Sequence, residues 1–243
     1  MGGKKKQGRG KGKSKTTSGV DNVQDVLSKS EQFIEKNQKR LLTIVCIVIA
    51  VVLGILAFFN LYLEPRENEA RKLIYQGEQY FKVDSFRLAL EGDDNFIGFE
   101  AIKEQFGMTK TANLASAYIG LCYKELGEYD NAIDALKDFD ANDNMIAPAI
   151  IVAIGDCYVE TGKIKESIDY FLKASDKADN ELISPIALKK AAVAHEKLKE
   201  YDKAIKLYTV IQDKYYNSPE GRDMQKFIDR ATALKASPET ASN

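Results

Sequence analysis

The sequence predicts an all-α protein in which a single N-terminal transmembrane helix is followed by a solenoid of helical hairpins. Three observations lead to this prediction: an uncharged apolar segment at residues 41–63, a repeat of about 34 residues in the part that follows, and a composition that favours helices. Five Pro and no Trp, with many Lys, Glu, Ala and Leu, are typical of helical rather than all-β or collagen-like chains.

Charge divides the chain of 243 residues into three segments. Residues 1–40 hold eleven Lys and Arg against four Asp and Glu, which gives a formal charge of +7. Residues 41–63 carry no charge, and the remaining 24 basic and 32 acidic residues give −8. The net charge of −1 therefore conceals a basic tail, a neutral segment and an acidic domain.

The basic tail is expected to be disordered over residues 1–20, because no apolar residue occurs between Met1 and Val20. It could contact anionic lipid head groups or ribosomal RNA, or act only as a topology determinant and solubilising tail. Nucleic acid is not an expected partner, since no aromatic residues are present to stack on bases. Residues 21–40 are expected to form a juxtamembrane amphipathic helix, because apolar residues recur near helical spacing at Val23, Val26, Leu27, Phe33 and Ile34.

The apolar segment at residues 41–63 is predicted to be a transmembrane helix. Its 23 residues would span about 35 Å as a helix, more than the roughly 30 Å of a bilayer's hydrocarbon core. A buried core helix would be shorter, and a cleaved signal peptide would have a shorter apolar run and a cleavage pattern, whereas the exit here reads FFNLYLEPRENEA. The segment is therefore expected to remain as a signal anchor.

Flanking Lys and Arg residues predict the orientation of this anchor. Within twenty residues of the segment there are four on each side, but the rest of the basic tail adds seven more on the N-terminal side. Since cytoplasmic flanks carry the excess of positive residues, the N-terminus is expected inside and the acidic domain across the membrane.

Residues 115–139, 150–174 and 187–211 align with one another without gaps. Two small residues in each copy would let two antiparallel helices approach closely, while an aromatic ring and a large apolar residue would fill the gap between repeats. In chain order, the aligned positions hold Gly120, Gly155 and Ala192; Tyr123, Tyr158 and His195; Gly127, Gly162 and Lys199; Ala132, Ser167 and Ala204; and Leu136, Phe171 and Tyr208.

This pattern resembles the tetratricopeptide repeat, which implies a tetratricopeptide-like solenoid with three repeats at residues 113–217. Residues 64–112 are expected to form a degenerate or extended first repeat, interrupted by the Gly- and Asp-rich stretch EGDDNFIGF. Residues 218–235 are expected to form a capping helix, with Ser218 as N-cap and Pro219 in the first helical position, before a disordered tail at residues 236–243.

A solenoid of this kind offers a concave groove lined mainly by the first helix of each repeat. The groove is expected to suit an extended or helical peptide segment, and either to be open or to be covered by the chain's own first or last helix. The clamp by which some tetratricopeptide domains hold a C-terminal carboxylate is not expected, because Leu121, Asp156 and Val193 stand where it needs Asn. The peptide-binding residues are predicted to be Leu114, Ala117, Leu121, Lys124, Val152, Asp156, Val159, Lys189, Val193 and Glu196, with Glu125, Ala149, Glu160, Ile186 and Lys197 at the remaining equivalent positions.

Residues that often carry chemistry are few. Cys122 and Cys157 could form a disulfide in an oxidising compartment, but helix spacing favours two separate packed thiols. His195 is the only histidine and is expected to pack between helices. Without a nucleophile motif, a phosphate-binding loop or metal-ligand spacing, the chain is expected to be no enzyme, with no catalytic or metal site and no cofactor.

The whole layout is similar to the bacterial ancillary subunit of the SecYEG translocon. Three segments carry the likeness: FIEKNQKRLLTIV, EARKLIYQGEQYF and EAIKEQFGMTKTANLASAYIGLCY. The resemblance implies a single-pass protein of the bacterial inner membrane with a cytoplasmic N-terminus and a periplasmic repeat domain. Its implied partners are translocon subunits, periplasmic chaperones or exported chains. Two alternatives stay open: a structural scaffold in envelope assembly or cell division, and an anchored receptor that faces the cytosol.

Overall fold

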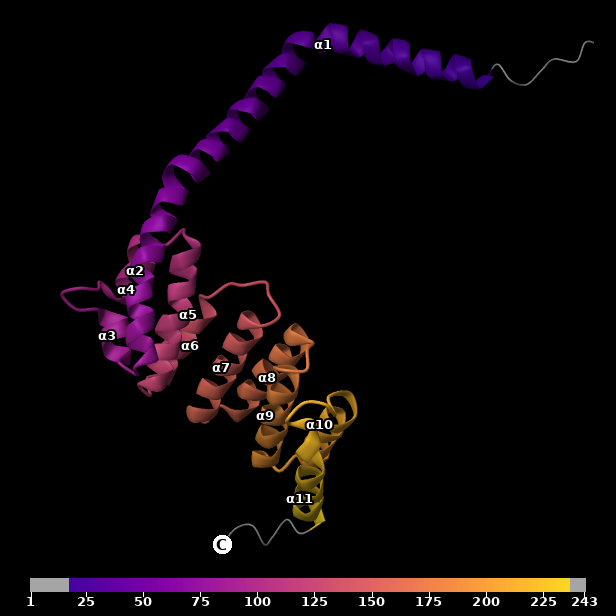
Figure 1. Cartoon of the computed structure of the whole chain (residues 1–243). Coiled ribbons are helices and arrows are strands. Elements are labelled where there is room, and N and C mark those ends of the chain that lie inside the picture. The colour runs from indigo at the N-terminus through magenta and orange to yellow at the C-terminus, as the bar shows by residue number, and fades with distance from the viewer. Residues whose placement is uncertain (1–17, 237–243) are drawn as a thin grey trace, which may run out of the picture. The chain divides into compact units, whose positions relative to one another are not determined.

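Helices make up all the regular structure in the computed structural model, which describes the backbone of residues 18–236 and the side chains of residues 36–236. Within these limits the one β-type pairing is an isolated bridge between Asp93 and Phe96. The chain divides into two compact units, Met1–Asn60 and Leu61–Asn243. The predicted all-α fold is confirmed (Figure 1).

The first unit is dominated by helix α1, Ser18–Ala57, which is 40 residues long. The predicted tail at residues 1–20 is wrong for its last three residues, which are helical, while residues 1–17 lie outside the described part. The predicted boundary at residue 40 is not a break, because α1 passes through it. Nearly all side chains of the predicted amphipathic segment at residues 21–40 also lie outside the described part.

One helix in the described side-chain range is long and apolar enough to span a membrane, Lys36–Lys82. None of its most apolar 18-residue window is buried inside the protein, whereas the core helix of a soluble domain would be mostly buried. The helix type changes near the predicted end of the span: Phe58–Leu63 is a π-helical stretch, and α2 begins after it at Glu64. The predicted boundary at residue 63 is therefore a change of helix type rather than an interruption.

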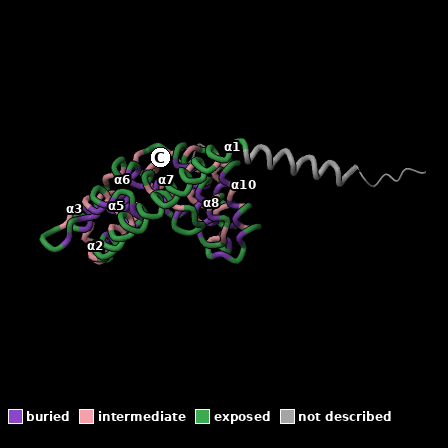
Figure 2. The backbone as a smooth tube through the Cα atoms, turned by 90° about the horizontal axis from the view of Figure 1, so that it is seen from above, coloured by how far each residue is buried: buried purple, intermediate pink, exposed green. Residues whose placement is uncertain are grey.

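The second unit is a row of helical hairpins, which Figure 1 shows running from α2 to α11. We call the first helix of a hairpin helix A and the second helix B. Figure 2 shows the buried residues along the sides of the helices that face their neighbours. The elements are α2 (Glu64–Lys82), α3 (Phe86–Glu91), α4 (Gly98–Gln105), the three hairpins α5–α6 (Lys110–Glu125, Tyr129–Lys137), α7–α8 (Ile146–Glu160, Ile164–Ala178) and α9–α10 (Ser184–Lys197, Tyr201–Lys214), the 3-10 turn η2 (Gly221–Asp223) and α11 (Met224–Ala236).

Each hairpin closes where a small residue of helix A lies under a large residue of helix B. A Cβ atom added to Gly120 would lie 2.4 Å from Leu136 Cγ, and one added to Gly155 would lie 2.5 Å from Phe171 Cε1. The large residue thus packs on the small residue of its own hairpin, which the sequence prediction did not foresee. Leu136 also belongs to the same buried cluster as Ile154 of the next hairpin, so it helps to fill the gap between repeats as expected.

The turns between helices A and B require left-handed backbone at one equivalent position. Gly127 and Gly162 have φ of 78° and 75°, and Lys199 has φ of 59° at the same place in the third hairpin. Glycine adopts this region at little steric cost, whereas a Cβ crowds the following carbonyl. The backbone of the third turn is therefore strained at Lys199, whereas the other two turns have glycine there.

Helices α2 and α4 pack on α5 ahead of the first complete hairpin. α2 and α5 run parallel, because Glu67 accepts a hydrogen bond from Thr111 N at 3.1 Å and, further along both helices, Tyr118 Oη donates to Glu78 at 3.2 Å. The interrupting stretch EGDDNFIGF forms the end of α3, a tight turn and the start of α4. Phe99 follows that turn, is fully buried and stacks on Tyr118 with ring centroids 4.9 Å apart.

The C-terminal helix begins later than predicted. Ser218 Oγ accepts a hydrogen bond from Gly221 N at 3.0 Å, so it caps the short turn that contains Pro219 and η2. α11 starts at Met224, which places Pro219 outside it. Met224 and Ala231 are fully buried, and α11 packs along α10. The expected disordered tail at residues 236–243 begins with the last residue of α11 and otherwise lies outside the described part.

A pair of substitutions tests the close approach inside the hairpins. We expect Gly155→Ala to lower the free energy of unfolding by about 1–2 kcal/mol, because overpacking outweighs the gain in helix propensity. The free energy of unfolding is measured by titrating the full chain in detergent with urea and monitoring the loss of helix by circular dichroism. In a Phe171→Leu background this cost should shrink, since the atoms nearest to the added Cβ all belong to the Phe171 ring.

Gly120→Ala is the matched comparison. Its added Cβ would also lie 2.9 Å from the backbone nitrogen of Leu136, which truncation of that side chain cannot remove. Its cost should therefore persist in a Leu136→Ala background. Full tolerance of Gly155→Ala would contradict the packing described above.

Candidate functional site

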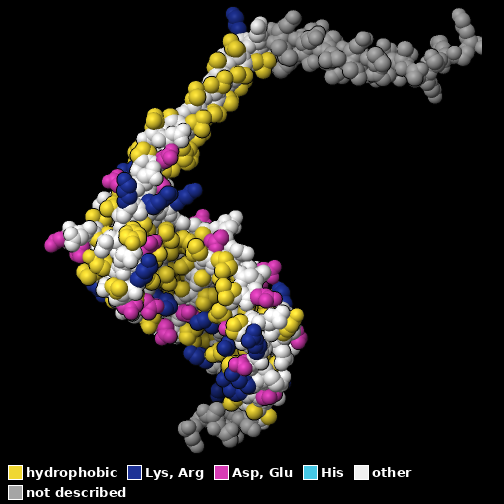
Figure 3. Space-filling view, viewed as in Figure 1, with side chains coloured by type: hydrophobic (Ala, Val, Ile, Leu, Met, Phe, Trp, Pro, Cys, Tyr) yellow, Lys and Arg dark blue, Asp and Glu magenta, His cyan; other side chains and the backbone are white. Residues whose placement is uncertain are grey.

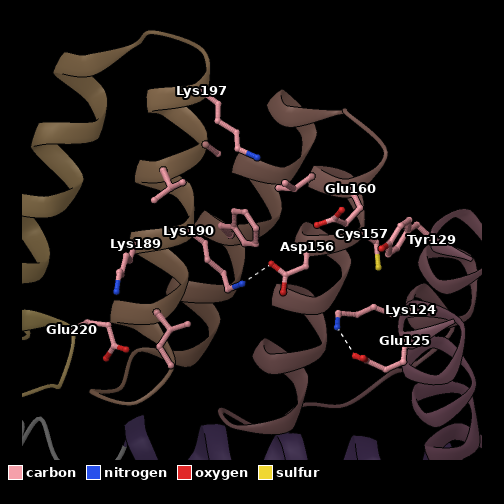
Figure 4. A pocket seen from close by; sticks show the side chains of 15 residues that line it. Lys124, Glu125, Tyr129, Asp156, Cys157, Glu160, Lys189, Lys190, Lys197 and Glu220 are labelled. Carbon is pink, nitrogen blue, oxygen red and sulfur yellow. Dashed lines mark hydrogen bonds and ion pairs between the residues drawn. The ribbon is translucent and has the colours of Figure 1, made fainter. Parts of the chain in front are cut away.

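A cavity of about 640 Å³ opens between the first helices of the three hairpins (Figure 4). Apolar side chains from three helices form its floor, including Val159 of α7, Phe171 of α8 and Val193 of α9. Phe171 is almost fully buried, so its ring forms a rigid base beneath the exposed residues. We call this cavity the A-helix groove; its lining residues are Lys124, Glu125, Tyr129, Asp156, Cys157, Val159, Glu160, Phe171, Ile186, Lys189, Lys190, Val193, Ala194, Lys197 and Glu220.

Charged residues surround this apolar floor. Lys190 Nζ of α9 lies 2.7 Å from Asp156 Oδ1 of α7, which joins two neighbouring hairpins across the groove (Figure 4). Lys124 Nζ lies 2.7 Å from Glu125 Oε1. Although burial of the Lys124 ammonium opposes it, the Glu125 carboxylate raises the pKa of Lys124, which therefore stays charged. The groove can bind apolar side chains and charged groups together.

Two lysines of the groove remain available to a ligand. Among the residues that the structure describes, neither Lys189 nor Lys197 forms an ion pair within 4.0 Å. Lys189 lies over the ring of Phe227, with Nζ 4.9 Å from the centroid. The two lysines stand on one face of α9 with Val193 between them, so this wall alternates cation, apolar side chain and cation.

Five of the ten predicted site residues line the A-helix groove: Lys124, Asp156, Val159, Lys189 and Val193. All five lie in the C-terminal parts of α5 and α7 or along α9. Four of the further residues at equivalent positions line it too: Glu125, Glu160, Ile186 and Lys197.

The other five predicted residues lie elsewhere. Leu114 lines a separate hollow of about 410 Å³ between α2 and α5. Leu121 and Val152 are half-buried, and Leu121 packs against the core cluster between the first two hairpins. Ala117 is only 3% exposed and belongs to that cluster with residues of α6 and α7, so little of its side chain is accessible to a ligand.

Glu196 is held by the chain itself. Its Oε2 atom lies 2.7 Å from Arg230 Nη2 of α11, and its side chain is only 11% exposed. The hydroxyl of Tyr208 is buried nearby, where burial and then the Glu196 carboxylate raise the pKa of that phenol. The last helix thus covers one side of α9 at Glu196, while the A-helix groove on the other side stays open to solvent.

Sequence reasoning missed the groove residues contributed by helices B and by loops: Tyr129 of α6, Phe171 of α8 and Glu220 before η2. It also missed Lys190, although a signal for it existed. Asp156 and Lys190 are 34 residues apart, as are Glu196 and Arg230, and this separation is close to the 35 and 37 residues between aligned positions of successive repeats. Opposite charges at that separation mark pairs between equivalent helices.

The cysteines and the histidine of the repeat domain are buried. Cys122 and Cys157 are free and fully buried, and burial raises their pKa values to about 12 and about 11. His195 is 8% exposed, with Nδ1 2.6 Å from Glu200 Oε2 in its own hairpin. Its counterpart Tyr158 contacts the preceding hairpin instead, because Lys137 Nζ donates to the phenol oxygen at 2.8 Å. Within the searched side chains, no group of three His, Cys, Asp or Glu is placed to hold a metal ion.

Hydrophobic side chains gather over α5 and α7 on the face shown in Figure 3, with Lys, Arg, Asp and Glu side chains around them. Stacked hairpins that present such a surface define a helical-repeat solenoid, a class whose extended surfaces contact other proteins. Models of the tetratricopeptide repeat match residues 118–142, 149–176 and 187–218. The chain therefore contains tetratricopeptide repeats, which form a protein–protein interaction module. No curated protein is similar enough to this chain in sequence to match it.

Arg230→Ala tests how α11 is held on the third repeat. The substitution leaves the poorly exposed Glu196 carboxylate without its ion pair, so we expect a loss of about 1–2 kcal/mol in the free energy of unfolding. Amide hydrogen exchange should become faster in α11. Lys226→Ala is the control, because Lys226 and Asp223 form an exposed pair that contributes little. Equal effects of the two substitutions would contradict this assignment.

Proposed function

We propose that this protein is a membrane-anchored binding module that holds segments of other proteins in the A-helix groove, without catalysis, as an ancillary component of protein export. In this proposal the N-terminus is cytoplasmic, residues 41–63 cross the bacterial inner membrane, and the repeat domain is periplasmic. Its partners are translocon subunits, periplasmic chaperones or exported chains. The observation that carries the binding function is the open groove with an apolar floor and a charged rim.

The groove suits a short extended or helical segment. Val159, Ile186 and Val193 offer apolar contacts, and their burial by a ligand would supply most of the binding free energy. Lys189 and Lys197 favour acidic side chains along α9, whereas Glu160 on the α7 wall favours a basic one. Such a site accepts many sequences, which suits the varied chains that pass through an export site.

Anchoring makes weak binding sufficient. A single span confines the groove to the membrane surface and raises its effective concentration near any partner in the same membrane. The helix Lys36–Lys82 supports this arrangement, because it continues into α2, the first helix of the solenoid. The excess of Lys and Arg within residues 1–40 supports a cytoplasmic N-terminus.

Photocrosslinking from the groove tests the proposed partners. A photoreactive residue at Val193 in the full chain should capture translocon subunits, periplasmic chaperones or exported chains in living cells. The same residue at Asp169, an exposed position on α8 that is not part of the groove, is the control and should capture far less. Capture of cell-division or wall-synthesis proteins at Val193 would support a scaffold instead and contradict the export role.

A reporter fused after Asn243 tests the orientation. An enzyme that is active only outside the cytosol should be active in this fusion, because the excess of Lys and Arg before the span keeps the N-terminus inside. A matched fusion of a reporter that is active only in the cytosol should be inactive. The reverse result would place the repeat domain in the cytosol and contradict the proposed localisation.

A further inference from the structure

The loops that enter each helix A lie along one edge of the solenoid, and each carries an exposed large apolar residue. In Figure 1 these loops lie along the upper right of the repeat domain, and the turns between helices A and B along its lower left. We call the first side the loop edge. Its apolar residues, with their exposed fractions, are Met108 (63%), Met145 (44%), Ile146 (55%), Leu182 (57%) and Tyr216 (64%).

The opposite edge, where the turns between helices A and B lie, carries fewer exposed large apolar residues. The three turns at residues 126–128, 161–163 and 198–200, all inside the described part, carry no exposed large apolar residue, although Val83 after α2 is 68% exposed on this edge. A hydrophobic residue just before a helix can pack back on the first turns of that helix, which would explain such residues locally. Met108 and Leu182 stand at that place, but their exposed fractions of 63% and 57% show that such packing does not cover them.

Hydrogen bonds between repeats hold the loop edge in place. The Asn113 side chain donates to Asp140 O at 2.7 Å and accepts from Asp140 N at 2.9 Å. The Asn180 side chain donates to Asn144 O at 2.8 Å and accepts from Leu182 N at 2.9 Å, so it ties two successive loops together. The exposed apolar residues therefore stand on a preorganised surface, which lowers the entropy cost of binding.

Acidic residues accompany the apolar ones. Asp140, Asp143 and Glu181 form no ion pair among the described residues. Hydrogen bonds from the backbone N–H groups of Met145 and Ile146 hold the pKa of Asp143 below its usual value, so this carboxylate is ionised at neutral pH. A partner for this surface needs basic groups beside apolar ones, while anionic lipid head groups would be repelled.

The loop edge also begins where the chain leaves the apolar segment. Glu67 near the start of α2 binds Thr111 at the start of α5, so the N-terminal ends of these two parallel helices share this edge. α2 begins at Glu64, directly after residues 41–63. The edge is thus joined to the predicted membrane exit by the first turn of one helix, which keeps it within reach of proteins in the same membrane.

We propose that the loop edge is a second docking surface, separate from the A-helix groove, and that it binds the basic, apolar extramembrane face of another integral membrane protein. Met108, Met145, Ile146, Leu182 and Tyr216 would be covered by apolar side chains of that protein, and Asp140, Asp143 and Glu181 would meet its Lys and Arg residues. This surface uses the anchor of the proposed function but not the groove, so a docked partner leaves the groove free.

Photocrosslinking in native membranes tests the loop edge. The full chain carries a photoreactive residue at Leu182, and the adduct is identified by mass spectrometry down to the attached peptide. We expect an integral membrane protein, attached at an extramembrane segment rich in Lys and Arg. Raising the salt concentration before irradiation should reduce the yield, because the contact depends on opposite charges.

Variants in which carboxylates are replaced by amides test whether the contact depends on the acidic residues of the loop edge. The double variant Asp140→Asn with Glu181→Gln should reduce the Leu182 adduct about fivefold, the effect of losing two surface ion pairs. The matched control, Glu166→Gln with Asp169→Asn, removes two exposed carboxylates from α8 and should leave the yield unchanged. Crosslinking from Val193 should be unchanged in both, which separates failure of this proposal from failure of the proposed function.

Several results would overturn the proposal. They are an adduct with lipid, an adduct with a second copy of this chain, an adduct with a water-soluble protein, and the absence of any adduct at Leu182 while Val193 still captures its partner. A yield that falls equally in the double variant and in its control would overturn it as well.

Discussion

The close approach of helices A and B inside each hairpin is the constraint on which the rest of the solenoid depends. Gly120 and Gly155 leave space that Leu136 and Phe171 fill, and in the third hairpin Ala192 and Tyr208 stand at the equivalent places. A side chain larger than alanine at the small position would push the helices apart. Because the hairpins could then no longer stack in register, the spacing of the A helices and the groove between them would also be lost.

The groove follows from this stacking. Equivalent A helices lie side by side, so residues separated by about one repeat meet, as Asp156 and Lys190 do at 2.7 Å. By the same rule α11 takes the place that the helix A of a further repeat would have beside α9, and Arg230 of α11 forms an ion pair with Glu196 of α9. The last helix therefore closes the end of the solenoid and removes one predicted contact residue, yet leaves the main groove open.

The apolar helix and the solenoid are joined without a loop. α1, a π-helical stretch and α2 follow one another through Lys36–Lys82, and α2 packs directly on α5. Two surfaces with different chemistry lie on the same repeat domain: a groove of mixed charge and an acidic edge with exposed apolar residues.

The sequence by itself determined the helical class, the three repeats and the apolar helix, because each depends on a local pattern: helical spacing, a period of about 34 residues, and a run of uncharged residues. Half of the residues that it predicted for the groove line the cavity. Only the tertiary structure decided that Ala117 is covered and Glu196 is paired, since both depend on helices from other repeats. The tertiary structure alone also showed that Phe171 forms the floor of the groove and that Pro219 lies outside α11. Burial and helix ends depend on what packs against a residue as well as on its neighbours in sequence.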